Sequence, residues 1–186
     1  MGESMAAIPP VCDFNQAAKE FKLLSVDGQF YKYQDIAGSK GALIMFICNH
    51  CPYVIAVMDR IIRDAVELGT YGIGVAAICS NDPIKYPDDS YKNMQRFAQK
   101  NSLPFPYLHD EEQSVARAYE AVCTPDFFGY NSSAKLQYRG RLDASRKEAG
   151  PLNLTRDLFE GMVQISNTGI GPNNQVPSMG CSIKWK

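Results

Sequence analysis

The stretch "GALIMFICNHCPYV", residues 41–54, places two cysteines three positions apart, with a histidine between them, directly after an apolar run. Residues 41–47 form a continuous apolar segment, which predicts a buried strand. After Asn49 the apolar residues recur at helical spacing, on a face made of Val54, Met58, Ile61, Ala65 and Leu68. The dithiol Cys48/Cys51 is therefore expected at a strand-to-helix junction.

This position predicts an activated thiol at Cys48. The unpaired N–H groups and positive dipole end of a helix N-terminus favour an anion, so we expect a depressed pKa for Cys48. Asn49 is suited to cap the helix, and Pro52 falls in its first turn, where a missing N–H costs little. A protonated His50 would stabilise the Cys48 thiolate further.

Two other interpretations of the dithiol stay open. Cys48 and Cys51 are either inert core thiols or half of a zinc site, but tetrahedral zinc needs two more nitrogen or sulfur ligands. No second C-x-x-C or H-x-H occurs, and the remaining candidates are scattered single residues: His109, Cys123 and Cys181. We therefore expect no metal and no cofactor.

Composition limits the class of protein. With 186 residues, 45% of them hydrophobic, the chain is long enough for one domain (1–186) with a full core and no disulfide staples. A net charge of −1 gives no basic surface for nucleic acid or anionic lipid. The segment 1–13 reads as an N-terminal arm without signal-peptide character, and no apolar stretch approaches the roughly 20 residues of a membrane span. The simplest prediction is a cytoplasmic protein, in which C-x-x-C indicates catalysis or metal binding.

The order of predicted elements favours an α/β fold. A β-hairpin is expected over 21–36 around Asp27-Gly28, followed by β-α-β-α-β-α-β-β-α, which predicts helices flanking a mixed central sheet. The tail 167–186 is rich in Gly, Pro and Asn and is expected to be irregular. Because it ends in Ile183 and Trp185, we expect it to pack on the domain.

A second informative segment is "AVCTPDFF", residues 121–128, where Thr124-Pro125 lies at the entry to a predicted strand. X-Pro bonds tolerate the cis form at modest cost, although a trans proline at a strand start is also open. A cis turn here would direct the backbone of Thr124 outward, to pair with an extended substrate peptide.

From about Phe14 to the C-terminus the chain resembles the thioredoxin-like superfamily. The resemblance is to the redoxin branch shared by alkyl hydroperoxide reductase/thiol-specific antioxidant proteins and membrane-tethered thiol-disulfide oxidoreductases. It rests on "LLSVDGQFYKYQDI", "MFICNHCPYV", "VCTPDFFGYN", "YRGRLDAS" and "PSMGCSIKWK". It implies a thioredoxin-like fold with an N-terminal hairpin, Cys48 as attacking thiol, Cys51 as resolving thiol and Pro125 as a cis-proline.

The departures from thioredoxin concern the dithiol itself. Ile47 replaces its tryptophan, and Asn49-His50 replaces its Gly-Pro, which resembles DsbA-type oxidants and implies a less reducing couple. The buried acid of thioredoxin would fall near Ala42, so acid-assisted proton transfer is in doubt.

Peroxidase chemistry is the runner-up. Peroxiredoxins carry Pro and Thr or Ser seven and three residues before the reactive cysteine. Before Cys48 these positions hold Gly41 and Met45, so the hydroxyl that orients peroxide is absent. Arg139 or Arg141 is a candidate for the peroxidatic arginine, but each is expected to be an exposed charge at a strand end.

The other cysteines receive separate interpretations. Cys79 reads as a core residue and Cys12 as part of the arm, whereas Cys123 and Cys181 are candidates for additional redox thiols. The hypothesis is a thiol-disulfide oxidoreductase that acts on protein or small-molecule disulfides, in which Cys48 attacks and Cys51 resolves, aided by His50, Thr124 and Pro125. The alternatives are a thiol peroxidase and a redox-inactive module that binds a peptide, or a metal through Cys48, His50 and Cys51.

Overall fold

The structure is a computed structural model that describes residues 6–9 and 13–186, so the expectation for Cys12 lies outside the described residues. Its strands are β1 (Ala6–Ala7), β2 (Lys22–Ser25), β3 (Phe30–Lys32), β4 (Gly41–Phe46), β5 (Ile73–Cys79), β6 (Tyr107–His109), β7 (Cys123–Thr124), β8 (Asp126–Asn131), β9 (Leu136–Tyr138) and β10 (Gly180–Ser182). The helices are α1 (Tyr33–Ile36), α2 (Pro52–Ile55), α3 (Met58–Thr70), the 3-10 turn η1 (Pro87–Asp89), α4 (Tyr91–Asn101), α5 (Ser114–Ala118) and α6 (Asp157–Thr168).

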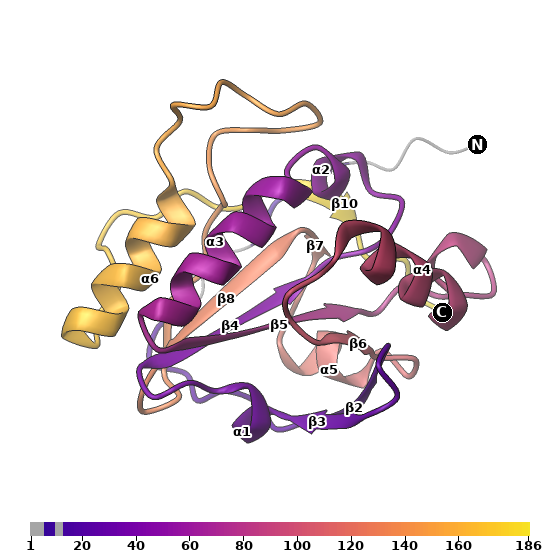
Figure 1. Cartoon of the computed structure of the whole chain (residues 1–186), viewed down its shortest axis with the longest axis horizontal. Coiled ribbons are helices and arrows are strands. Elements are labelled where there is room, and N and C mark those ends of the chain that lie inside the picture. The colour runs from indigo at the N-terminus through magenta and orange to yellow at the C-terminus, as the bar shows by residue number, and fades with distance from the viewer. Residues whose placement is uncertain (1–5, 10–12) are drawn as a thin grey trace.

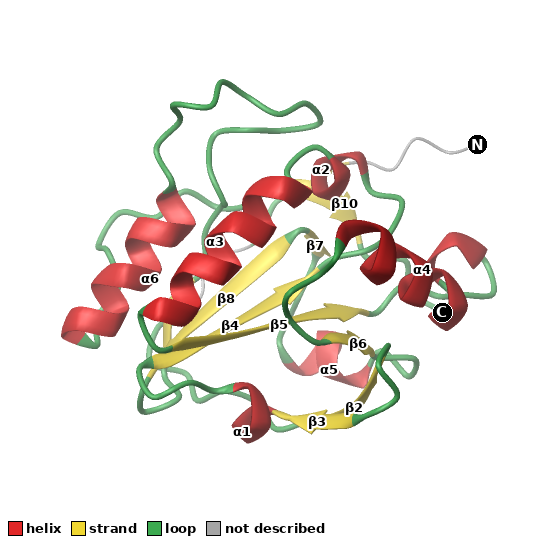
Figure 2. Ribbon diagram, in the orientation of Figure 1, coloured by secondary structure: helices red, strands yellow, loops and turns green. Residues whose placement is uncertain are grey.

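The centre of the fold is a mixed sheet flanked by helices, as the sequence predicts (Figure 1). One part has the order β3-β2-β6-β5 and the other β4-β8-β9. Figure 2 shows β4 and β5 side by side, where the Ile47 amide donates to the Ile78 carbonyl at 3.0 Å. β5 and β6 run parallel, whereas the pairs β2–β3, β2–β6, β4–β8 and β8–β9 run antiparallel.

Strand β4 is buried along its whole length because helices cover both faces of the sheet. Leu43 and Met45 point to one face and share a core with residues of α3 and α6. Ile44 and Phe46 point to the other face, where the Phe46 and Tyr119 rings meet at 5.6 Å. β4 is thereby fixed from both sides, and it ends at the dithiol.

The predicted hairpin forms from β2 and β3, with Gly28 at a positive φ of 82° in the turn. Its expected second strand ends early, because Tyr33–Ile36 forms α1. Helix α3 carries the predicted apolar face, and Arg60 and Asp64, which lie outside that face, are also buried. Arg60 forms an ion pair at 2.6 Å with Asp143, which lies in the long loop that precedes α6.

A second, small sheet has the order β1-β10-β7 and joins strands near the two ends of the chain to the segment before Pro125. The tail 167–186, expected to be irregular, contains β10, which pairs antiparallel with both neighbours. Beyond it Ile183 is buried, and the Arg117 guanidinium lies 4.4 Å from the centre of the Trp185 ring. None of the helices in the described part of the chain has the length and apolar character of a membrane span.

Candidate active site

The two cysteines lie where β4 gives way to the first turn of α2. Cys48 follows Ile47 at the end of the strand, and Cys51 directly precedes Pro52, the first residue of α2. The Cys51 carbonyl accepts the Ile55 amide at 2.9 Å, which begins the helical turn. Both side chains are almost completely buried, Cys48 at 1% and Cys51 at 0% exposure.

The segment before the cis-proline lies against both thiols. The Thr124–Pro125 peptide bond is cis. The Thr124 hydroxyl lies 3.4 Å from the sulfur of Cys48, and the Cys51 thiol donates to the Thr124 carbonyl at 3.1 Å. Thr124 therefore touches both members of the dithiol, through two different groups.

Cys181 completes a group of three thiols. It stands opposite Thr124 in the antiparallel pairing of β10 with β7, and it is 5% exposed. Its side chain hydrogen-bonds to the sulfur of Cys51. The tail thus places Cys181 in a strand against the dithiol, not in the irregular segment that the composition suggested. The Thr124 backbone, predicted to pair with a substrate peptide, pairs here with the chain's own β10.

The acidity of the thiols differs from the expectation. Hydrogen bonds from the thiols of Cys181 and Cys48 lower the pKa of Cys51. The hydrogen bond with Cys51, burial and the charge of Asp89 raise the pKa of Cys48. The prediction of a depressed pKa for Cys48 was therefore wrong, because it considered the helix terminus and left out the hydrogen bond with Cys51 and the burial of the thiol. The two thiols share a hydrogen bond and titrate as a pair.

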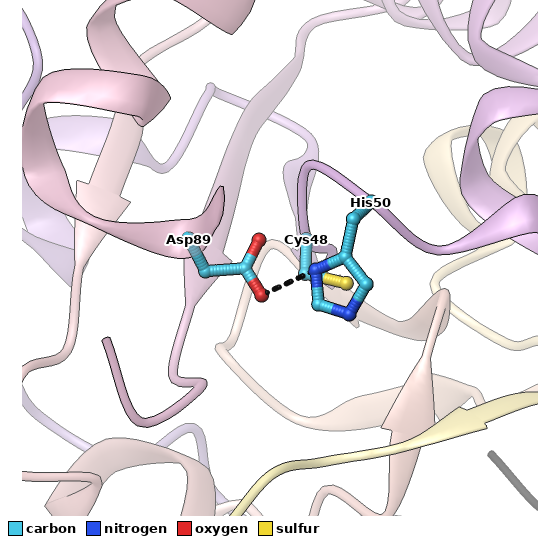
Figure 3. A group of neighbouring side chains, drawn as sticks. All are labelled: Cys48, His50 and Asp89. Atoms are coloured by element: carbon cyan, nitrogen blue, oxygen red, sulfur yellow. Dashed lines mark ion pairs between the residues drawn. The ribbon is translucent and has the colours of Figure 1, made fainter. Parts of the chain in front are cut away.

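His50 and the carboxylate of Asp89 both lie near the sulfur of Cys48 (Figure 3). Its Nδ1 lies 2.9 Å from Oδ2 of Asp89, and its ring stacks on Tyr86 with 6.0 Å between centroids. The contact with Asp89 raises the pKa of His50. Near Cys48 the positive charge of a protonated His50 is offset by the negative charge of Asp89.

Asp89 is the residue that the sequence analysis missed. It lies at the end of η1 and is fully buried, where it accepts the Asn49 amide at 2.8 Å and the Asn81 side-chain amide at 2.7 Å. Asn49 in turn donates to the Asp88 carbonyl and accepts from the Tyr107 hydroxyl. A buried acid thus accompanies the dithiol, but it comes from η1 and not from the strand position of Ala42.

One group among the described residues has the donor set of a metal site. The sulfur of Cys48, an imidazole nitrogen of His50 and a carboxylate oxygen of Asp89 all lie within 4.8 Å of one another. Sulfur, nitrogen and oxygen donors in this combination suit zinc, which takes four ligands. The sequence suggested Cys51 as the third ligand, whereas the structure brings Asp89 to that place.

Other candidates make their hydrogen bonds and ion pairs with groups other than the sulfurs of Cys48 and Cys51. Side chains alternate along β7, so that Thr124 faces Cys48 while the Cys123 thiol contacts the Pro125 carbonyl at 3.5 Å and Ser178 at 3.9 Å. Burial raises the pKa of Cys123, and Cys79 is a core residue. Arg139 is not an exposed charge: it is buried and pairs with Asp126 at 3.2 Å, while Arg141 pairs with Asp157 at 2.5 Å.

The mixed sheet flanked by helices, with a cis-proline against a Cys-x-x-Cys segment, defines a thioredoxin-like protein. A family model described as the AhpC/TSA family matches residues 14–143. The chain belongs to this family.

Two solved structures are similar over nearly the whole chain. An uncharacterized conserved protein from Geobacillus kaustophilus is 40% identical, with a TM-score of 0.92 over 100% of this chain and 98% of that one. A hypothetical protein from Sinorhizobium meliloti is 32% identical, with a TM-score of 0.91 over 96% of this chain and 98% of that one.

A more distant structure shares the fold alone. The thioredoxin domain of a thiol-disulfide oxidoreductase from Bacteroides vulgatus is 11% identical, with a TM-score of 0.59 over 73% of this chain and 91% of that one. A search of curated proteins finds no match.

Proposed function

We propose that the protein is a thiol-disulfide oxidoreductase that works through Cys48 and Cys51. The observation that carries the proposal is the contact of both thiols with Thr124, directly before cis-Pro125. Two thiols that share a hydrogen bond are close enough to form a disulfide after small side-chain rotations. Protein or small-molecule disulfides are the substrates, in a cytoplasmic protein that needs no cofactor.

Cys48 is the attacking thiol in this proposal. Its neighbour His50 is partly exposed, whereas Cys51 is fully buried, with its sulfur hydrogen-bonded to Cys181 of β10. Cys48 gives up its proton and its thiolate attacks one sulfur of the substrate disulfide, whose other sulfur leaves as a thiolate and takes up a proton. Cys51 then gives up its proton and attacks the sulfur of Cys48. The second substrate sulfur leaves as a thiolate that takes up this proton, and the Cys48–Cys51 disulfide remains.

Trapping of the covalent intermediate tests the proposal. The variant Cys51→Ser, mixed with a peptide disulfide, is expected to accumulate a peptide–Cys48 mixed disulfide, because its resolving thiol is missing. Cys48→Ser is expected to lose most of the exchange rate, while Cys123→Ser keeps it, since that thiol contacts Ser178 and not the dithiol. A wild-type exchange rate in Cys48→Ser would contradict the proposal.

The second candidate function is metal binding, which the grouping of Cys48, His50 and Asp89 favours. Reduced protein is incubated with zinc, desalted and assayed for bound metal. If the site holds zinc, about one equivalent is retained and Asp89→Asn loses it, while Asp88→Asn does not. Zinc retained by both Asp89→Asn and Asp88→Asn would contradict this function. So would a wild-type protein and variants that all fail to retain zinc.

A further inference from the structure

The strand that carries Cys181 is held beside the dithiol from two sides. In the small sheet Cys181 pairs with Ala6 of β1 on one side and with Thr124 of β7 on the other. After Ser182 the pairing continues, because the Ile183 amide donates to the Val122 carbonyl at 3.1 Å. The placement of Cys181 is therefore a consequence of regular strand pairing and not of one side-chain contact.

Gly180 allows β10 to approach the cis-proline segment this closely. A Cβ atom at position 180 would overlap the carbonyl oxygen of Thr124 and come within 3.0 Å of the Pro125 nitrogen. Only glycine fits at this approach of two backbones. The local sequence Gly-Cys-Ser thus brings a thiol against Thr124, at the edge where an extended substrate strand was predicted to pair.

The sulfur of Cys51 lies between two other thiols. It shares one hydrogen bond with Cys48 and another with Cys181, and these three side chains are nearly inaccessible to solvent. When Cys48 and Cys51 are joined in a disulfide, the pairing of β10 with β7 is expected to keep the thiol of Cys181 beside the Cys51 sulfur. This is the sulfur that an exchange reaction must attack to release Cys48.

We propose that Cys181 is a third redox thiol, an internal substrate that exchanges with the Cys48–Cys51 disulfide by attack on Cys51. The inference rests on the exchange function proposed above. Cys181 gives up its proton and its thiolate attacks the sulfur of Cys51. The Cys51–Cys181 bond forms, the Cys48–Cys51 bond breaks, and Cys48 leaves as a thiolate that takes up a proton. The number of disulfides does not change, so this step needs no further oxidant.

The consequence is that the protein has two oxidised forms. In one form Cys48 is part of the disulfide, and in the other it is a free thiol beside His50 while the disulfide lies behind β10. The second form keeps one disulfide in a covered position and leaves Cys48 able to attack a further substrate disulfide. Cys181 in the tail is thereby a thiol when Cys48 is part of the disulfide, and part of the disulfide when Cys48 is a thiol.

Disulfide mapping tests the proposal directly. Trypsin cleavage after lysine and arginine leaves Cys48 and Cys51 together in peptide 41–60, Cys123 in 118–135 and Cys181 in 157–184. The variant Cys48→Ser is treated with glutathione disulfide, quenched with acid, alkylated and digested. We expect peptide 41–60 to be joined to 157–184 through Cys51. The Cys123→Ser version of this variant should give the same product, whereas the Cys181→Ser version should stop at the Cys51–glutathione mixed disulfide.

Wild-type protein provides a measurement that needs no substitution. Oxidised to one disulfide per chain and equilibrated before the quench, it should contain the product of 41–60 joined to 157–184, and no product of 41–60 joined to 118–135. Absence of the first product, in wild type and in Cys48→Ser, would overturn the role of Cys181. If the wild type still forms Cys48–Cys51 and exchanges disulfides, only this inference fails; if it does neither, the proposed function fails as well.

Discussion

Nδ1 of His50 lies 2.9 Å from Oδ2 of Asp89, and this ion pair borders the sulfur of Cys48. Asp89 is fully buried and has its carboxylate fixed by two amide donors, whereas His50 reaches the surface. The carboxylate stabilises a protonated imidazole, while the same charge disfavours a thiolate on Cys48. Asp89 therefore raises the pKa of both groups, because it favours the charged form of His50 and the neutral form of Cys48.

Removal of this charge should change the titration of His50. In Asp89→Asn the pKa of His50 is expected to fall toward the ordinary histidine value of about 6.5, because the neutral amide no longer stabilises the imidazolium. Histidine ring signals followed by NMR against pH measure this shift. Asp88→Asn is the matched control, since the Asp88 carboxylate contributes less to His50. An unchanged His50 titration in Asp89→Asn would contradict the ion pair.

The same ion pair should make stability depend on pH. The folded-state pKa of His50 is raised, so its contribution to the free energy of unfolding is fully present below the unfolded value of about 6.5 and is lost as the pH rises through the higher folded-state value. The stability difference between wild type and Asp89→Asn is thus expected to shrink over that interval. Urea unfolding at several pH values measures the difference. A difference that grows with pH would contradict the assignment.

The sequence predicted the part of the site that follows from local patterns. An apolar run covered by helices on both faces identified β4, and helical spacing identified the buried face of α3. Together these two patterns predicted that Cys48 and Cys51 lie at a strand-to-helix junction. The X-Pro dipeptide indicated the turn at Thr124, which the structure places against the dithiol.

The parts that the sequence did not predict depend on long-range contacts. Asp89 lies 40 positions after Asn49, in a three-residue turn among other acidic residues, and nothing local marks it as buried. Strand β10 has three residues in a segment rich in Gly and Pro, which is too short for an alternation of apolar and polar residues to indicate a strand. Both reach the dithiol by tertiary packing. The hydrogen bond with Cys51, together with burial and the charge of Asp89, raises the pKa of Cys48 against the expectation from the helix terminus.

The side chain of Asn49 should be important for stability. It accepts a hydrogen bond from the buried Tyr107 hydroxyl at 2.9 Å and donates to the Asp88 carbonyl at 2.8 Å. Asn49→Ala leaves the Tyr107 hydroxyl without this acceptor, which is expected to lower the free energy of unfolding by about 1–3 kcal/mol. Chemical denaturation measures the loss. Asn93→Ala, whose hydrogen bonds are solvent-exposed, is the control and should change stability by less than about 1 kcal/mol.

Reaction with hydrogen peroxide should be slow. Positions 41 and 45 hold Gly and Met in place of the residues that orient peroxide, and Arg139 is engaged with Asp126 and the Glu120 carbonyl. Reduced protein is therefore expected to be oxidised at the rate of an ordinary thiolate, since thiolate character alone does not orient the O–O bond. Stopped-flow fluorescence or competition with a peroxidase measures the rate. A rate several orders of magnitude higher would favour the peroxidase alternative over disulfide exchange.

Displacement of β10 should expose the thiols that it covers. In Gly180→Ala the new methyl group would overlap the Thr124 carbonyl oxygen, so that β10 cannot keep its pairing with β7. Alkylation of Cys51 and Cys181 by iodoacetamide is expected to accelerate by about tenfold or more, because a detached short strand opens far more often than a paired one. Peptide mapping after timed quenching measures the rate at each cysteine.

The matched control is Gly69→Ala in α3. A Cβ atom at position 69 meets nothing within 4 Å and lies in a helix, where alanine is preferred to glycine. This variant should keep the wild-type alkylation rates and match or exceed the wild type in stability. Equal alkylation rates in Gly180→Ala and Gly69→Ala would show that β10 does not limit access to the dithiol. Faster alkylation confined to Cys51 and Cys181, with Cys79 unchanged, distinguishes local opening of β10 from general unfolding, because Cys79 lies in the core of the central sheet.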